Sequence, residues 1–231
     1  MNVGALIHPE MCCGCRRPAR GALCHGCLLT VRRIEPVCQR CESRMAGGAD
    51  GCHECRGGSF DQAVQAFHFD EPIRKAIHRL KYRGELGIAA TLARAAVDRA
   101  WHRMAKEPQA IGWVPSSDSR TRDRGFDHAA LIAASISQIT GVPCFEALRK
   151  IRETPQQVKL EPEQRREVIR GAIRARLPSP PKILIVDDVF TTGTSVSESS
   201  RALKAAGAEW VGAFCIARSS GRSPARQASS R

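Results

Sequence analysis

The sequence predicts an α/β protein with a doubly wound parallel sheet and a small metal-binding segment at its N-terminus. Between residues 60 and 218, apolar strand-like runs alternate with helix-like segments, the pattern of a parallel sheet covered by helices. One run, 182–189, contains paired acids and is followed by a Thr- and Gly-rich loop. Four CxxC pairs lie within the first 55 residues. We therefore expect a zinc-binding domain at 1–59, an α/β domain at 60–218 and a disordered basic tail at 219–231.

Two different spacings of apolar residues predict the first strand and the first helix of the α/β domain. Residues 60–69 alternate apolar and polar side chains, which predicts a strand. Residues 71–82 place apolar side chains three or four positions apart, with Pro72 in the first turn, and predict an amphipathic helix. A longer Ala-rich helix is expected from 86 to about 106.

The rest of the domain continues this alternation. Strands are expected at 110–115, 142–148, 182–189 and 209–217, and helices at 127–140, 162–170 and 195–206. Only 5% of the residues are aromatic, so the core is expected to be built mainly from Ala, Val, Leu and Ile.

The segment at the end of the 182–189 strand has the composition of a phosphate site with acids at its rim. The acids are Asp187 and Asp188, and the residues after them are Val189, Phe190, Thr191, Thr192, Gly193, Thr194 and Ser195. Ligands bind at the carboxyl ends of parallel strands, where loop N–H groups and a helix N-terminus attract phosphate. The carboxylates suit ribose hydroxyls or Mg²⁺. An ordinary buried strand and turn is the alternative, but burying two adjacent carboxylates is costly.

A second candidate anion site follows the strand at 110–115. Pro115 and Ser116 lead into a basic loop that carries Arg120, Arg122 and Arg124. This strand is expected to end at the same edge of the sheet as the acid pair, so both loops would face one ligand. A solvated basic loop is the alternative.

Eight of the eleven cysteines form CxxC pairs. The pairs are Cys12/Cys15, Cys24/Cys27, Cys38/Cys41 and Cys52/Cys55. Two CxxC turns complete a tetrahedral Cys₄ site, so one or two structural zinc ions are expected. Sequential pairing of the turns closes the shorter loops, and interleaved pairing remains open. A redox role is disfavoured because no thioredoxin-like pattern surrounds the pairs. His25 and His53, inside two turns, could replace a ligand, although solvated turn residues are the simpler interpretation.

The charge of the chain favours polyanionic ligands. The net charge is +13, and Arg supplies most of the 36 basic residues. Guanidinium groups make bidentate contacts with phosphate, which suits pyrophosphate, nucleotides or nucleic acid. No apolar stretch approaches the length of a membrane span, and residues 1–11 lack the pattern of a signal peptide. No membrane insertion and a cytoplasmic location are therefore expected.

Taken together, the motifs resemble the ComF family, which includes competence protein ComF and relatives called GntX. The resemblance rests on the CxxC pairs, residues 80–84, 115–126, 152–160 and 206–208, and the acid-pair loop, which itself resembles the phosphoribosyl-pyrophosphate (PRPP) motif of type I phosphoribosyltransferases. Asp127 and His128 depart from the family's Asn and Gln, Val168 replaces an expected Asn, and Phe190 is bulkier than the usual aliphatic residue.

The resemblance implies a phosphoribosyltransferase-type sheet that binds PRPP with Mg²⁺. Asp187 and Asp188 would then be the catalytic acids that hold the ribose, and the loop 189–195 would bind the 5′-phosphate. The Pro115 turn would meet the pyrophosphate, residues 152–160 would belong to a flap, and Lys81 and Tyr82 would lie on the hood side of the site. The family also implies single-stranded DNA and the DNA-uptake machinery of natural transformation as partners. An active transferase with an unidentified acceptor is the alternative, and a zinc-stabilised interaction protein with a vestigial loop is a third interpretation.

Overall fold

The computed structural model describes residues 11–45, 51–152 and 169–219. The side chains of Asp118 and Arg120 lie outside this description. Most of the predicted helix at 162–170, residues 153–160 of the expected flap, and the tail beyond residue 219 also fall outside it. Val168 is outside as well.

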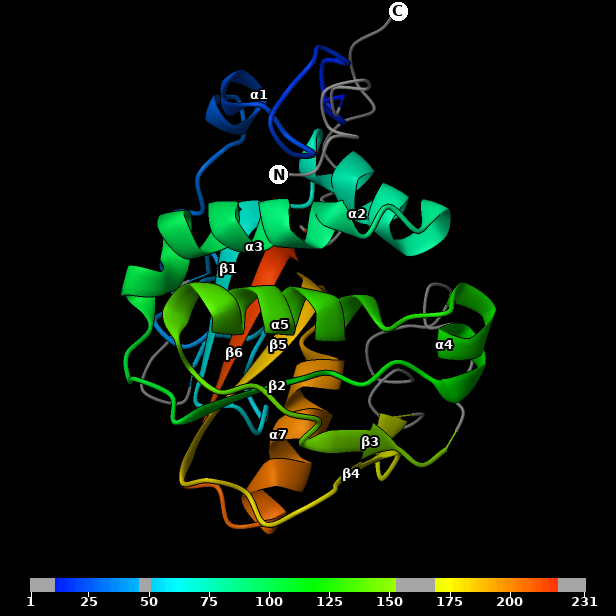
Figure 1. The fold of residues 1–231 in the computed structure, drawn as a ribbon. Helices are drawn as coiled ribbons and strands as arrows, with labels where there is room; N and C mark the ends of the chain where they lie inside the picture. The colour runs from blue at the N-terminus through cyan, green and yellow to red at the C-terminus, as the bar shows by residue number, and fades with distance from the viewer. Residues whose placement is uncertain (1–10, 46–50, 153–168, 220–231) are drawn as a thin grey trace, which may run out of the picture.

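The centre of the fold is a four-stranded parallel sheet (Figure 1). Its strands lie in the order β1 (Gln62–His68), β6 (Trp210–Arg218), β5 (Lys182–Phe190) and β2 (Ala110–Trp113). All three neighbouring pairs are parallel. The two central strands, β5 and β6, carry long runs of buried apolar residues, as expected for strands covered on both faces. The parallel sheet predicted from the sequence is confirmed.

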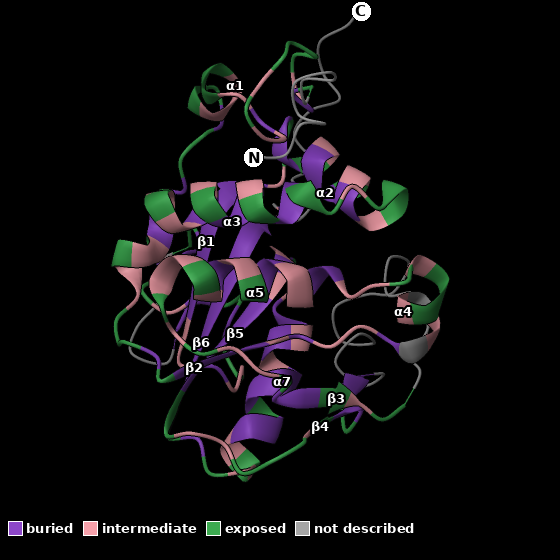
Figure 2. Ribbon diagram, viewed as in Figure 1, coloured by how far each residue is buried: buried purple, intermediate pink, exposed green. Residues whose placement is uncertain are grey.

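Helices cover both faces of this sheet. On one face lie α3 (Gly87–Ala100) and α5 (His128–Thr140), side by side across the strands in Figure 1. On the other face lies α7 (Thr194–Ala205), beside a small antiparallel pair formed by β3 (Leu148–Lys150) and β4 (Ile173–Ala175). Figure 2 shows that the strands are mostly buried, whereas these helices alternate buried and exposed residues. The doubly wound α/β architecture is therefore also confirmed.

The remaining helices are short and lie around this core. They are α1 (His25–Leu29), α2 (Ile73–Arg83), η2 (Trp101–Arg103) and α4 (Asp118–Arg124). α2 buries Ile73, Ile77 and Leu80, the apolar face that the sequence predicts. Gly84 ends α2 at a φ of +65°, a conformation that favours glycine.

The predicted strand at 142–148 is wrong. Cys144 forms only an isolated bridge with Ile111, and the amide of Ile111 donates to the carbonyl of Pro143 at 2.8 Å. Pro143 has no N–H with which to extend a ladder. Leu148 instead begins β3 and pairs with β4, outside the main sheet.

The basic segment after Ser117 is a helix rather than the predicted loop. Ser117 has an extended backbone at the N-cap position, and Gly125 ends α4 at a φ of +77°. Ser before a helix and Gly after it are common capping residues, but the sequence of α4 has no apolar stripe, so the periodicity that predicts a helix is absent.

The N-terminal segment contacts both faces of the sheet. Cys12 and Leu23 belong to the core that α3 and α5 share with the strands. Cys38, Cys52 and Phe60 belong to the opposite core, which includes residues of α7. The two halves of the Cys-rich segment therefore pack on different sides of the α/β domain.

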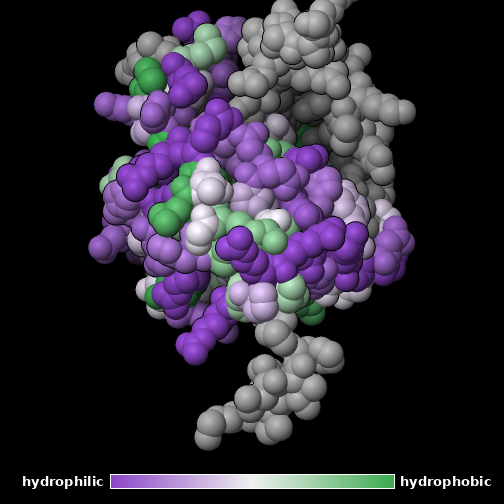
Figure 3. All heavy atoms as spheres, turned by 90° about the horizontal axis from the view of Figure 1, so that it is seen from above, coloured by the Kyte–Doolittle hydropathy of each residue, from purple (hydrophilic) through white to green (hydrophobic). Residues whose placement is uncertain are grey.

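The surface of the described residues is predominantly polar. Seen from above, it is mainly hydrophilic, with small apolar areas near its centre (Figure 3). Within the described ranges, every helix is too short or too polar to cross a bilayer.

Candidate functional site

The carboxyl ends of β2 and β5 bring the two predicted anion loops to one edge of the sheet. Trp113 pairs with Val186, and the amide of Val114 donates to the carbonyl of Val186 at 2.9 Å. Pro115 and Ser116 follow directly, beside the strand that carries the acid pair. β5 continues past the acids to Phe190, where it still pairs with Arg218 of β6.

Asp188 is buried and held by two side chains from other elements. Lys81 of α2 forms an ion pair with its Oδ2, and His128 Nε2 lies 3.3 Å from its Oδ1. Burial alone would raise the pKa of Asp188, but the Lys81 ammonium and the His128 hydrogen bond outweigh it and lower the pKa. The same pairing raises the pKa of Lys81 despite the desolvation of its ammonium group. Asp188 is therefore a permanent carboxylate with a cation already beside it.

Asp187 is partly exposed and has the opposite electrostatic character. Its Oδ1 accepts the backbone N–H of Asp188 at 2.8 Å. Desolvation, together with repulsion from the Asp188 charge, raises the pKa of Asp187 well above its ordinary value. Because Asp188 is enclosed by Lys81 and His128, Asp187 is the more accessible of the two acids.

The loop after the acid pair presents backbone donors at the start of α7. Gly193 precedes the helix at a φ of +68°, and the first helical bond runs from Ser197 N–H to the Gly193 carbonyl at 2.7 Å. The amides of Thr194, Ser195 and Val196 therefore have no intrahelical acceptor. No side chain of the described residues caps this helix start. Thr191 is exposed, and the hydroxyls of Thr192 and Thr194 lie 2.8 Å apart. An anion fits such a helix terminus.

Of the three arginines of α4 that were predicted to bind an anion, the structure places one, Arg124, among the side chains around the acids. The Nη1 of Arg124 lies 3.4 Å from Nδ1 of His128 and its guanidinium covers the ring of Tyr82. Since Arg only donates, His128 accepts at Nδ1 and donates from Nε2 to Asp188. The side chain of Arg122 is exposed, and that of Arg120 lies outside the description.

Asp127 and His128 belong to the candidate site, although the sequence motifs do not assign them to it. The Asp127 carboxylate caps α5 by accepting from the amide of Ala129 at 2.9 Å, and it also accepts from the amide of Ser116 at 3.1 Å. It thereby fixes the Pro115 turn to α5. In the sequence, both residues stand out only as departures from the family's Asn and Gln, and this departure is the signal that points to them.

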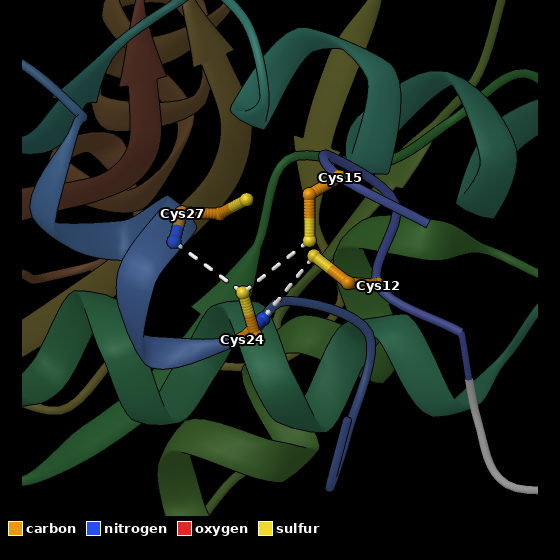
Figure 4. A group of neighbouring side chains, drawn as sticks. All are labelled: Cys12, Cys15, Cys24 and Cys27. Atoms are coloured by element: carbon orange, nitrogen blue, oxygen red, sulfur yellow. Dashed lines mark hydrogen bonds between the residues drawn. The ribbon is translucent and has the colours of Figure 1, made fainter. Parts of the chain in front are cut away.

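The eight paired cysteines form two separate groups. In Figure 4, Cys12 and Cys15 from one turn face Cys24 and Cys27 from the start of α1. The second group consists of Cys38, Cys41, Cys52 and Cys55. In each group the sulfur atoms all lie within 4.8 Å of one another. Sequential pairing, the preferred prediction, is confirmed, and neither His25 nor His53 belongs to a group.

The spacing of these sulfur atoms is compatible with structural zinc. A tetrahedral site with Zn–S bonds near 2.3 Å has sulfur–sulfur edges of about 3.8 Å. The separations are 3.7 Å for Cys15–Cys24, and 3.6 and 3.8 Å for Cys41–Cys52 and Cys38–Cys55. Burial would raise the pKa of Cys12, but backbone N–H groups, with that of Cys24 first, outweigh burial and lower it to about 6. The thiolate is the form that binds a metal, whereas burial and the neighbouring thiols raise the pKa of Cys27 in the same group to about 12.

Several characterised proteins resemble this chain over most of its length. Competence protein F of Haemophilus influenzae is 29% identical over 90% of this chain and 95% of the relative. The DNA utilization protein YhgH of Salmonella typhimurium is 28% identical over 92% of this chain and 99% of the relative. Competence protein ComFC of Streptococcus pneumoniae is 25% identical over 85% of this chain and 87% of the relative. The resemblance to ComF-type proteins predicted from the motifs is confirmed by these relatives.

Similar solved structures include phosphoribosyltransferases. The glutamine PRPP amidotransferase of B. subtilis, complexed with ADP and GMP, matches 59% of this chain and 26% of its own, with 20% identity and a TM-score of 0.35. The adenine phosphoribosyltransferase of Leishmania tarentolae matches 56% of this chain over 72% of its own length, with 13% identity and a TM-score of 0.32. No protein-family model matches the chain.

Proposed function

We propose that this chain, a relative of the competence proteins F and ComFC, binds PRPP or a related phosphoribosyl ligand and acts in the uptake or handling of single-stranded DNA. The observation that carries the proposal is the pairing of two acids with an open helix N-terminus on one strand–loop–helix unit. The amides of Thr194 and Ser195 offer donors to a 5′-phosphate, and Asp187 offers acceptors to the ribose hydroxyls.

The donor set of the site fits Mg²⁺. Aspartate oxygens are hard ligands, and Mg²⁺ in proteins is commonly shared between one or two carboxylates and the phosphates of a substrate. Asp187 would supply the protein oxygen, because Lys81 and His128 already engage both oxygens of Asp188. When bound, the ion would neutralise the charge of the pyrophosphate group.

The charge of the chain and the names of its relatives support the nucleic-acid part of the proposal. Two kinds of relative are named for competence and for DNA utilization. A net charge of +13 supplied mostly by Arg suits a strand contacted through its phosphates.

The proposal is tested by calorimetric titration of the zinc-loaded protein with PRPP and Mg²⁺, alone and with a short single-stranded oligonucleotide. Binding should disappear in the double variant Asp187→Ala/Asp188→Ala. Glu209→Ala removes an exposed carboxylate at the opposite edge of the sheet, where β6 begins, and should bind PRPP like the parent protein. If PRPP gives no heat in the parent protein, the phosphoribosyl part of the proposal fails. If the oligonucleotide gives no salt-dependent heat, the nucleic-acid part fails.

An active phosphoribosyltransferase is a second candidate, favoured by the pair of acids at the end of β5. Displacing pyrophosphate from PRPP builds positive charge on the ribose, and this pair, with Asp187 as its more accessible member, would stabilise that charge. Pyrophosphate release from PRPP, measured over a panel of nucleobase and amine acceptors, tests this candidate. Turnover should require Mg²⁺ and be abolished by Asp188→Asn. Absence of release with every acceptor in the panel would count against a transferase for those acceptor classes.

A further inference from the structure

Tyr82, the single tyrosine of the chain, is unusually exposed for an aromatic residue beside a buried site. It lies in the last turn of α2 with 68% of its surface accessible, immediately after Lys81. Successive side chains on a helix point about 100° apart, so Lys81 reaches down to Asp188 while Tyr82 faces outward. The ring therefore lies exposed beside the Lys81–Asp188 ion pair rather than in the core.

Two neighbours hold the ring in place. The guanidinium carbon of Arg124 lies 5.2 Å from the ring centroid, and the imidazole of His78 meets the ring at 5.6 Å and 67°. The end of α2 also lies close to the segment after α4: a Cβ atom built on Gly84 would be in van der Waals contact with the ring of Phe126, at 3.9 Å. The Tyr82–Arg124 pair is thus formed by two motifs far apart in the sequence.

Tyr82 and Arg124 are each one residue away from a contact with Asp188, through Lys81 and His128 respectively. Tyr82 follows Lys81, whose ammonium group contacts Asp188. Arg124 contacts His128, whose other ring nitrogen contacts Asp188. A flat group resting on this pair would lie near a sugar held by the acids.

We propose that Tyr82 and Arg124 form a stacking platform for a nucleobase, beside the phosphoribosyl site. The ring offers an exposed π face, and the guanidinium group offers a second planar surface with a positive charge. Stacking accepts every base, because each has a π face, and therefore predicts little sequence preference. The base comes either from a free nucleotide or from a single strand whose sugar-phosphate occupies the neighbouring site. This inference rests on the proposed function, because that function places the sugar at the acids.

The single tyrosine gives a direct test. Protein labelled with 3-fluorotyrosine should show one ¹⁹F resonance, which reports on Tyr82 alone. It is titrated with adenosine 5′-monophosphate, ribose 5-phosphate, an octathymidylate and an abasic strand of the same length. The base-containing probe that uses the platform should shift the resonance more than its base-free counterpart. A shift with the mononucleotide identifies a free nucleotide as the source, and a shift only with the octathymidylate identifies a strand.

Variants separate stacking from structure. Tyr82→Phe should retain the affinity for the base-containing probe, whereas Tyr82→Leu should weaken it at least about tenfold and leave ribose 5-phosphate binding unchanged. Arg124→Met should weaken the same probe. Leu177→Ala, which alters another exposed apolar residue, is the control and should change neither.

Two results would overturn the platform. One is a resonance that responds equally to base-containing and base-free probes, and the other is unchanged base-probe affinity in Tyr82→Leu. If ribose 5-phosphate binds and the bases do not, the platform fails while the phosphoribosyl site stands. If ribose 5-phosphate and PRPP do not bind but the base probes shift the resonance, the platform stands and the phosphoribosyl site fails.

Discussion

Phe60, just after the last CxxC pair, packs edge-on against Phe190 of the acid-pair strand, with ring centroids 5.9 Å apart. Arg218 joins the same contact, because its guanidinium lies 5.3 Å from the Phe190 centroid and donates to the carbonyl of Cys41 at 2.8 Å. The amide of Ser59 donates to Ser197 Oγ in α7 at 3.0 Å. The second cysteine group therefore supports the strand and helix that flank the loop between β5 and α7.

Loss of metal from the second cysteine group should weaken phosphate binding. Cys41→Ser removes a ligand from this group, and about tenfold weaker binding of ribose 5-phosphate is expected because the Phe60 and Arg218 contacts lose their anchor. Cys24→Ser, in the first group, is the matched control and should retain binding. Calorimetry gives the ribose 5-phosphate affinity of each folded variant, and metal analysis gives the amount of metal that each one retains. Equal losses in the two variants would show that the metals act on overall stability alone.

Replacing Lys81 should destabilise the fold as well as the site. Lys81→Met leaves the buried Asp188 charge without its main counterion, which costs about 3–5 kcal/mol of unfolding free energy when a buried pair is broken. Adding Asp188→Asn should recover part of this loss. Lys204→Met breaks the more exposed pair with Asp61 and should cost about 1 kcal/mol or less. Urea denaturation at neutral pH measures all three, and similar losses for Lys81→Met and Lys204→Met would contradict the prediction.

The two acids should affect the pH dependence of stability in opposite directions. The pKa of Asp188 is lowered from 3.8, so its contribution to stability is present above about pH 4 and is lost as the pH falls further. The pKa of Asp187 is raised above 3.8, so its contribution is present at low pH and is lost as the pH rises through the raised value. At pH 7, Asp187→Asn should therefore stabilise the protein and Asp188→Asn should destabilise it. Denaturation curves between pH 3 and 8 test this, and the same sign for both variants would contradict it.

The sequence predicted the sheet and the acid-pair loop because both depend on local signals. An apolar run that ends in Asp187 and Asp188 and is followed by Thr-Thr-Gly specifies a strand, a loop and a helix without reference to the rest of the chain. The predicted start of α7 differs from the observed start by one residue.

The partners of the acids could not be predicted in the same way. Lys81 and His128 reach Asp188 from α2 and α5, so their contacts depend on how the helices cross the end of the sheet. α4 was missed because its sequence has no apolar stripe, and the expected strand at 142–148 failed because Pro143 interrupts the ladder. Long-range packing, rather than periodicity, decides these features.

Asp127 should contribute to stability and to ligand binding through one carboxylate. Asp127→Ala removes the cap of α5 and the acceptor for the Ser116 amide, and a loss of about 1 kcal/mol or slightly more is expected. Asp127→Asn keeps one side-chain oxygen, which caps helices equally well, but its NH₂ group cannot accept from the Ser116 amide, so this variant should keep most of the stability and lose the hold on the Pro115 turn. Thermal unfolding and pyrophosphate binding measured together test this, because the Ala variant should lose in both and the Asn variant mainly in pyrophosphate binding.

Gly193 should tolerate alanine poorly for two separable reasons. Its φ of +68° is strained for any residue with a side chain, and an added Cβ would lie 2.6 Å from Cζ of Phe190. Gly141→Ala is a matched control, since it has a φ of +76° but no atom within 4 Å of the added Cβ. We expect about 1 kcal/mol of destabilisation for Gly141→Ala and clearly more for Gly193→Ala, with a parallel loss of ribose 5-phosphate affinity only in the latter.

The clash with Phe190 can be isolated by a second substitution. Phe190→Leu removes the ring, so the double variant Gly193→Ala/Phe190→Leu should lose less than the sum of the two single losses, measured by urea denaturation. Strict additivity would mean that backbone strain alone explains the requirement for glycine. A favourable coupling would instead show that Phe190, the bulky departure in the PRPP-type motif, requires glycine at 193 and thereby fixes the shape of the loop between β5 and α7.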